Sequence, residues 1–262
     1  MNDLRPEFMA KIVVFDSGLG SLSIIKAIQS ISKSDIIFFA DQQNFPYGNK
    51  SKTQLNSIIK KSIKTLQAQF SPDVLVMASN TPSLILNLST SKVIGVKPPL
   101  NEARKISKSK RIGILGTKSA IKSKGLTNYI KGEKISKSYK IFKINGSDLV
   151  ELVESGKFIT NKQYCKKIIK KILNDVISKN SIDTITLSST HLPFLKSLLD
   201  NEFPNVQFID PAYIVAEKVF KIIKNNQSKR NSLKIFTSGN PINLKKNLVK
   251  LKINNKISVL SI

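Results

Sequence analysis

Short apolar runs alternate with segments of helical periodicity along almost the whole chain, and this alternation constrains the fold more than any other feature. The apolar runs have the length of β-strands. Between them, apolar residues recur at helical spacing, as in 51–69, 161–179 and 211–225. Strands that alternate with helices predict parallel sheets joined by crossover helices, and therefore an α/β fold. The expected strands are 11–15, 36–40, 74–78, 92–96, 111–115, 139–144, 184–188, 206–209 and 233–237.

Two sets of similar segments indicate an internal repeat. Asp73 and Asp183 each stand six residues before a serine, and a strand-like run fills the interval in both cases. The segment KIVVFDS (11–17) is likewise similar to RIGILGT (111–117). Both matches have the same order along the chain, which predicts two related α/β halves. If the halves face each other, the ends of matching strands form two walls of one ligand site.

Small polar residues stand at the ends of several expected strands. Asp16, Ser79, Thr117 and Ser189 come at or just after the apolar runs. Open parallel sheets bind ligands beyond the carboxyl ends of their strands. We therefore expect the chemistry of this chain at these four positions.

Two turns that follow strands carry residue types suited to a ligand site. FDSGLG (15–20) places two glycines before a helix, but it lacks the G-x-G-x-x-G spacing of a dinucleotide site. No dinucleotide cofactor is therefore expected. In the second turn, Pro46 and Gly48 shape the backbone, and we expect the hydroxyl of Tyr47 to point into a cleft.

The charge balance is strongly positive, with 43 Lys and Arg against 17 Asp and Glu and a net charge of +26. Such a charge is typical of proteins that bind nucleic acid. However, the basic residues are spread along the chain, few of them are arginine, and tryptophan is absent. Nucleic-acid readers rely on arginine contacts and aromatic stacking. We therefore expect a solvated lysine surface and no nucleic-acid partner.

Other sequence features narrow the class of protein. A single cysteine, Cys165, and a single histidine, His191, argue against disulfides and against a Cys- or His-rich metal site. No apolar run is long enough to span a membrane, and the N-terminus has no signal-peptide core. We expect a cytoplasmic protein without cofactor or metal. Met9 is a candidate start, which makes 1–8 a flexible extension or leader.

Six sequence blocks, taken together and in order, resemble the signature blocks of the glutamate racemase family. The resemblance implies two pseudo-symmetric α/β domains with mostly parallel sheets, and an active-site cleft between them. It implies a first domain of 9–98 plus 212–262 and a second of 99–211. It also implies cofactor-independent interconversion of L- and D-glutamate by two opposed cysteines. The blocks are FDSG (15–18), PYGNKS (46–51), SNT (79–81), VIGV-x-PP (93–99), LVESG (152–156) and STH-x-P (189–193).

The chain departs from the family pattern where the chemistry is expected. The two cysteine positions of the family fall on Ser79 and Ser189, and a family threonine falls on Ala120. A thiol has a pKa near 8.5 and is readily ionised, whereas a serine hydroxyl needs a base beside it. The resemblance gives supporting roles in proton transfer to three other residues, which are Asp16, Glu154 and His191.

Three interpretations of the serines remain open at this stage. The chain is a racemase with slow or altered chemistry, a non-catalytic protein that binds acidic amino acids, or an engineered Cys-to-Ser form. A Ser-His-Asp hydrolase is disfavoured, because the chain has no G-x-S-x-G turn.

Neutral donors and acceptors are expected to bind the substrate, since no arginine lies in the matching blocks. Such groups suit a zwitterionic amino acid with a side-chain carboxylate, either glutamate or aspartate. A homodimer is compatible with the sequence. The expected binding residues are Ser17, Tyr47, Gly48, Asn80, Thr81, Thr117 and Thr190.

Overall fold

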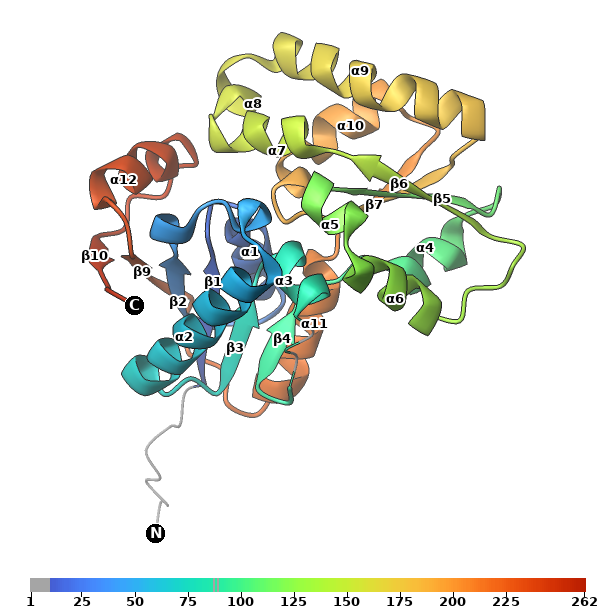
Figure 1. Cartoon of the computed structure of the whole chain (residues 1–262). Coiled ribbons are helices and arrows are strands. Elements are labelled where there is room, and N and C mark those ends of the chain that lie inside the picture. Colours follow the sequence, from blue (N-terminus) through green and yellow to red (C-terminus); the bar gives the residue numbers. More distant parts are fainter. Residues whose placement is uncertain (1–9, 87, 89) are drawn as a thin grey trace.

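The computed structural model describes residues 10–86, 88 and 90–262, and in it two parallel sheets form the centres of two lobes (Figure 1). The expected leader 1–8 and Met9 lie outside the described residues. The first sheet has the order β10-β9-β2-β1-β3-β4, and the second has the order β6-β5-β7-β8. Every strand pairing in the described part of the chain is parallel, which confirms the predicted α/β class.

The strands of the two sheets are the following. The first sheet consists of β1 (Lys11–Asp16), β2 (Asp35–Ala40), β3 (Val74–Met77), β4 (Val93–Gly95), β9 (Ser232–Thr237) and β10 (Ile257–Val259). The second sheet consists of β5 (Arg111–Gly116), β6 (Lys140–Asn145), β7 (Thr184–Leu187) and β8 (Gln207–Ile209). The nine expected strands are all present, and β10 is an addition that the sequence did not reveal.

Helices connect the strands and cover the sheets. The three helices expected from the sequence are α2, α9 and α11. Ser51 and Gln54 form a capping box at the start of α2, and the Asn161 side chain caps α9. The helices are α1 (Ser21–Ile31), α2 (Lys52–Phe70), α3 (Asn80–Ile85), α4 (Leu100–Ile106), α5 (Lys118–Lys122), α6 (Lys124–Gly132), α7 (Ser147–Glu154), α8 (Lys157–Thr160), α9 (Lys162–Asn180), α10 (Lys196–Glu202), α11 (Ala212–Ile223), α12 (Pro241–Lys250) and the 3-10 turns η1 (Gln42–Asn44), η2 (Tyr47–Asn49) and η3 (Leu192–Leu195).

The internal repeat appears in the strand register. In the first sheet Ile12 pairs with Val74, and in the second sheet Ile112 pairs with Thr184. The first four strands of each lobe also have the same spatial order, because β2-β1-β3-β4 corresponds to β6-β5-β7-β8. The two sheets are therefore built on one pattern.

Asp73 and Asp183, the aspartates of the repeat, accept hydrogen bonds from backbone N–H groups at or before the first strand of each lobe. The Asp73 carboxylate accepts a hydrogen bond from the Lys11 N–H at 2.8 Å, at the point where β1 begins. Asp183 does the same in the other lobe, since it accepts from the N–H groups of Lys108 and Ser109 at 2.7 and 2.6 Å. Both carboxylates lie before their strands, and therefore at the sheet edge opposite to the polar strand ends.

Both faces of the first sheet are buried, as parallel sheets require. Ile12 and Val14 belong to one apolar cluster, whereas Val13 and Phe15 belong to another on the opposite face. The C-terminal segment completes this lobe, because β9 pairs with β2 and α11 packs against α1. The exact domain bounds given above stay a prediction.

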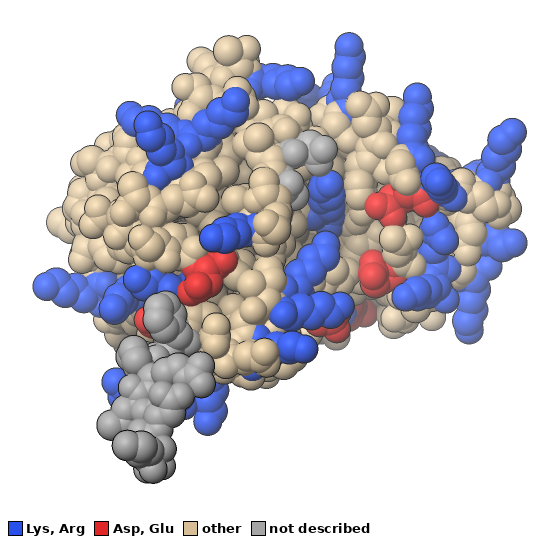
Figure 2. Space-filling model, turned by 90° about the horizontal axis from the view of Figure 1, so that it is seen from below, with Lys and Arg blue, Asp and Glu red and all other residues tan. Residues whose placement is uncertain are grey.

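Among the charged side chains on the visible surface, Lys and Arg predominate. Figure 2 shows Lys and Arg side chains spread over one face of the molecule, with few Asp and Glu side chains among them. No helix in the described part of the chain is long and apolar enough to cross a membrane.

Candidate active site

A cavity of about 590 Å³ lies where the carboxyl ends of strands from both sheets meet. The residues that follow β1, β2 and β3 form its first wall, and those that follow β5, β6 and β7 form its second. All twelve residues singled out in the sequence line it. They are Asp16, Ser17, Tyr47, Gly48, Ser79, Asn80, Thr81, Thr117, Glu154, Ser189, Thr190 and His191.

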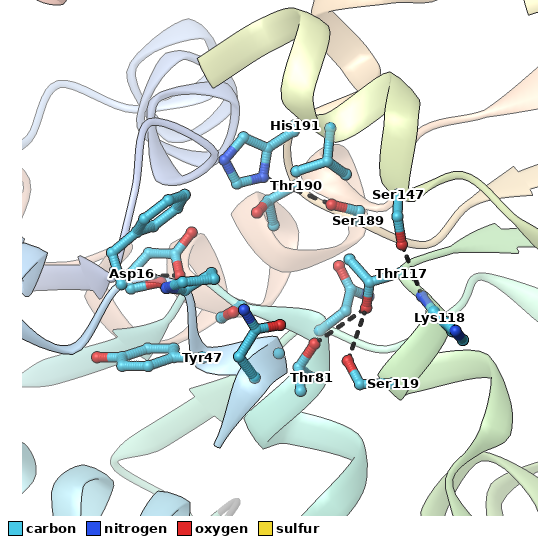
Figure 3. Close-up of a pocket in the computed structure, with 18 of the residues that line it drawn as sticks. Asp16, Tyr47, Thr81, Thr117, Lys118, Ser119, Ser147, Ser189, Thr190 and His191 are labelled. Carbon is cyan, nitrogen blue, oxygen red and sulfur yellow. Dashed lines mark hydrogen bonds between the residues drawn. The ribbon is translucent and has the colours of Figure 1, made fainter. Parts of the chain in front are cut away.

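Ser79 and Ser189 occupy equivalent places on the two walls. Ser79 follows β3 and is the N-cap residue of α3, with extended backbone and no capping hydrogen bond from its side chain. Ser189 follows β7, is almost fully buried, and lies with its hydroxyl 3.5 Å from His191 Nδ1 (Figure 3). A ligand in the cavity is therefore exposed to one strand-end hydroxyl from each lobe.

Asp16 is a buried carboxyl group with an unused acceptor. Its Oδ1 accepts a hydrogen bond from the Ser17 N–H at 2.7 Å, whereas its Oδ2 is buried and has no hydrogen-bond partner. Burial raises the pKa of Asp16 to about 7, against the lowering effects of His191, the Ser17 N–H and the Ser79 hydroxyl. Asp16 therefore changes its protonation near neutral pH.

His191 and Glu154 form a contact inside the second lobe. His191 Nε2 contacts Glu154 Oε1 at hydrogen-bonding distance. Burial opposes the charged form of both groups, but their mutual attraction outweighs it. The pKa of His191 is therefore above its usual value of 6.5, and the pKa of Glu154 is below its usual value of 4.5. His191 thus retains a proton more readily than an ordinary histidine does.

The first lobe helps to hold this contact. The backbone N–H of Leu19 donates a hydrogen bond to Glu154 Oε1 at 2.8 Å. A Cβ atom on Gly18 would lie 2.2 Å from the same oxygen, and one on Gly20 would lie 2.7 Å from His191 Nδ1. The two glycines of the FDSGLG turn therefore permit close approach of the second lobe.

Hydroxyl groups link the lobes on the other side of the cavity. Thr81 Oγ1 and Thr117 Oγ1 are 3.3 Å apart, and Thr117 Oγ1 lies 3.2 Å from Ser119 Oγ (Figure 3). The side-chain amide of Asn80 donates to the Val96 carbonyl at 3.2 Å, while its buried Oδ1 has no partner. The cavity thus presents hydroxyl groups, while the free amide oxygen of Asn80 is buried in its wall.

The structure corrects the expected orientation of Tyr47. Its ring lines the cavity and is buried, but its hydroxyl donates to Asp41 Oδ2 at 2.9 Å and points away from the other labelled residues (Figure 3). Asp41 also accepts from Asn44 and from Ser238. The carboxylate six residues earlier therefore holds the hydroxyl, and the part of Tyr47 in ligand binding stays a prediction.

Sequence reasoning missed several lining residues in the second lobe. Lys118, Ser119 and Lys122 come from α5, and Ser147 and Glu151 come from α7. Ala120, which stands at a family threonine position, is instead buried in the apolar cluster around Leu126. The i, i+4 spacing of Lys118 and Lys122 was the only available signal, since it places both on one helix face.

The described residues contain no group of three or more His, Cys, Asp or Glu side chains that could hold a metal ion.

The chain was compared with family models, with the sequences of known proteins and with solved structures. No family model matches the chain. It is 34% identical over 232 residues to a glutamate racemase of Sulfurihydrogenibium sp. (strain YO3AOP1), covering 86% of this chain and 87% of that one. It is 32% identical over 257 residues to a glutamate racemase of Aquifex aeolicus (strain VF5), covering 94% and 95%.

A solved structure agrees with these relatives. The crystal structure of a glutamate racemase isoform from Bacillus anthracis superposes with a TM-score of 0.81 at 25% identity, and the match covers 97% of this chain and 98% of that one. Glutamate racemases are isomerases. The sequence similarity and the common two-sheet architecture together show that this chain belongs to the glutamate racemase family.

Proposed function

We propose that this chain binds glutamate between its lobes and exchanges the proton on the α-carbon, which interconverts L- and D-glutamate without a cofactor. One observation carries the proposal. Ser79 and Ser189 follow equivalent strands of two related sheets and line one cavity, and each has a titratable side chain beside it. Asp16 stands beside Ser79, and His191 stands beside Ser189.

The polar atoms of the cavity suit a zwitterionic ligand. Asp16 Oδ2 and Asn80 Oδ1 are buried acceptors without partners, and a rotation of these side chains would turn them toward an ammonium group placed between the walls. The hydroxyls of Thr81, Thr117 and Thr190 are available to donate to carboxylate oxygens. These contacts would hold the α-carbon between the two serines.

Proton transfer would use the titratable groups through the serines. We infer that Ser79 and Ser189 occupy the two cysteine positions of the family. A serine hydroxyl does not ionise near neutral pH, so Asp16 would take up the proton on one face. His191 would supply a proton on the other face through Ser189, while Glu154 positions its imidazole. The opposite direction would use the same groups in reversed roles.

A second function has an observation in its favour. Ser189 has no base at short hydrogen-bonding distance in the part of the chain described, since its contact with His191 is 3.5 Å. Such a distance is long for a proton relay. A protein that binds an acidic amino acid without turnover would need the same cavity and no relay.

One experiment separates the two functions. The chain is incubated with L-glutamate or with L-aspartate in D₂O, and the amino acid is recovered for chiral analysis and mass spectrometry. Racemase activity predicts deuterium on the α-carbon and growth of the D-enantiomer. A Ser79→Ala/Ser189→Ala variant should show neither. Calorimetric binding of glutamate without any deuterium incorporation would support the binding protein, and absence of binding would overturn both functions.

A further inference from the structure

A second hollow lies on the outer side of the first lobe. It is an open groove of about 730 Å³ between α12 and β10, and none of the residues that line it also lines the cavity between the lobes. Figure 1 shows α12 and β10 together at the outer end of the first lobe, where β10 is the last strand of the sheet. The groove is therefore a surface feature separate from the candidate active site.

The floor of the groove is apolar and open to solvent. Ile242 and Val249 are two helical turns apart on α12, and their side chains are 65% and 49% exposed. Val259 lies on the same side of β10 as Ile257, because side chains alternate along a strand, and it is 59% exposed. Ile242 and Val259 are the most exposed large apolar side chains of the described residues. Apolar side chains exposed next to one another mark an interaction site.

Lysines surround this floor without any acidic side chain among them. Lys246, Lys250 and Lys256 line the groove, and none of the ion pairs between described residues involves them. The sequence contains no Asp or Glu after Glu217, so the C-terminal segment supplies no carboxylate that could neutralise them. Lysine is common elsewhere on the surface, but here it borders an apolar hollow. The groove therefore combines positive charge with apolar surface.

One edge of β10 is available to another strand. Within the described residues β10 pairs with β9 alone, and the Leu260 N–H donates to the Thr237 carbonyl at 2.9 Å. Because backbone groups alternate in direction along a strand, those of Ile257 and Val259 face the outer edge. The loop before β10 is held by Lys245, whose ammonium donates to two of its carbonyls at 2.7 and 3.2 Å. The outer edge is thus a fixed template for an added strand.

We propose that this groove docks an acidic segment of a partner protein, which adds as a strand to the outer edge of β10. Apolar side chains of the segment pack against Ile242 and Val249. Carboxylates on either side of them bind Lys246 and Lys250, since hydrogen bonds between ionised groups are about twice as strong as neutral ones. The inference goes beyond the proposed function, because it assigns to the chain a protein-binding surface outside the cavity.

The chemistry of the groove favours such a segment over other occupants. A second copy of this chain in a symmetric contact would bring the same lysines against each other. Nucleic acid would offer phosphates to the lysines, but the groove contains no aromatic side chain on which a base could stack. A membrane-binding helix buries a protruding apolar face among lipids, whereas these apolar side chains line a hollow.

The first test addresses charge with a synthetic peptide. Its centre has three valines separated by threonines, each end has two glutamates, and both termini are blocked. Binding is measured by calorimetry at fixed ionic strength to the unchanged chain and to Lys246→Glu/Lys250→Glu. The matched control is Lys60→Glu/Lys64→Glu, which reverses two exposed lysines at the same spacing on α2. Circular dichroism and the melting temperature establish that each variant is folded.

The expected result is a reversal of preference. Lys246→Glu/Lys250→Glu should bind the glutamate peptide about tenfold to a hundredfold more weakly, and it should bind a peptide with lysines in place of the glutamates more tightly than the unchanged chain does. The α2 control should stay within about twofold of the unchanged chain. Absence of binding to the unchanged chain at a peptide concentration on the order of 1 mM overturns the proposal, as does an equal loss in the control.

The second test addresses the apolar floor and the strand edge. Ile242→Ser should weaken peptide binding about threefold to tenfold, whereas Ile222→Ser, at an exposed position on α11, should not. Two further peptides carry N-methyl groups on the valines or on the threonines, so that each has one blocked edge. At least one of them should lose binding. Full binding of both overturns the addition of a strand to β10.

The other occupants are tested with the same variants. A dimer of the unchanged chain in sedimentation, lost in Ile242→Ser, would assign the groove to a second copy and overturn the proposal. Binding to phosphatidylglycerol vesicles that is lost in Lys246→Glu/Lys250→Glu, without binding of the peptide, would assign the groove to a membrane and overturn it as well. Glutamate binding should be the same in all these variants, because the substituted residues do not line the cavity.

Discussion

Glu154 in α7 accepts a hydrogen bond at 2.8 Å from the backbone N–H of Leu19, which follows β1 in the other lobe. The same carboxylate oxygen contacts His191. The position of an acid–base pair in the second lobe is therefore fixed partly by the backbone of the first. Closure of the lobes and the protonation of His191 are linked through this oxygen.

Gly18→Ala should break that link. The added Cβ would lie 2.2 Å from Glu154 Oε1, so the carboxylate must move or the lobes must separate. Overpacking of this kind costs about 1–3 kcal/mol. The pKa of His191 should fall toward its usual value, which NMR titration reports cleanly because it is the only histidine. Gly132→Ala is the control, since a Cβ there meets nothing within 4 Å. An unchanged His191 titration in Gly18→Ala would contradict the linkage.

Asp16→Asn should stabilise the fold at alkaline pH while it removes activity. The pKa of Asp16 is raised from 3.8 to about 7, so the native state keeps a proton that the unfolded chain loses. This group therefore makes stability fall as the pH rises from about 4 to about 7. The variant lacks this cost and should be more stable at pH 8 by on the order of a few kcal/mol, with little difference at pH 3.5.

Urea unfolding at several pH values measures this difference. Asp175→Asn is the control, because that carboxyl group is exposed in α9 and forms a surface ion pair with Lys179. A variant that loses stability at pH 8 would show that the carboxylate of Asp16 stabilises the native state.

Ser79→Cys together with Ser189→Cys should create or raise glutamate racemisation. A thiol can be ionised near the working pH, whereas a serine hydroxyl cannot, and the other groups of the site are already in place. Either single replacement should give less net inversion, with α-proton exchange on one face only. Chiral analysis and deuterium incorporation measure both quantities. A folded double variant that binds glutamate but shows no exchange would mean that the site has diverged beyond its two serines.

Tyr47→Phe should weaken the fold but not ligand binding. Its hydroxyl donates to the buried carboxylate of Asp41, and its removal leaves Asp41 Oδ2 with the hydrogen bond from Asn44 but without the one from Tyr47. The expected loss in the free energy of unfolding is about 1–3 kcal/mol. Glutamate affinity should stay within about twofold. Tyr213→Phe, at an exposed position on α11, should change neither quantity. A large loss of glutamate affinity with unchanged stability would show instead that the hydroxyl of Tyr47 contacts the ligand.

Much of the architecture could be predicted because strand periodicity and strand ends are local properties. The repeat in the sequence corresponds to equivalent strand pairings in the two sheets, Ile12 with Val74 and Ile112 with Thr184. The edge strand β10 escaped prediction because it has only three residues and none of them is fully buried.

The misses within the site have a different cause. Nothing in the sequence near Tyr47 shows where its hydroxyl points, because Asp41 is brought to it by the fold. The sequence did not single out Lys118 and Lys122, because lysine occurs along the whole of a chain with a net charge of +26. Only the packing of α5 against its core shows that these two face the cavity.

The return of the C-terminal segment to the first sheet has a mechanical consequence. The chain crosses between the lobes twice, once between Gly95 and Leu100 and once between Ile209 and Ala212, and prolines restrict the backbone at both crossings. Two short connections act as a double hinge, so opening about the line through them is the motion that strains the backbone least. Opening of this kind would break bridging hydrogen bonds, such as the one from Ser23 Oγ to the Thr190 carbonyl at 2.9 Å, and would separate apolar contacts such as those of Leu84 with the cluster around Leu126.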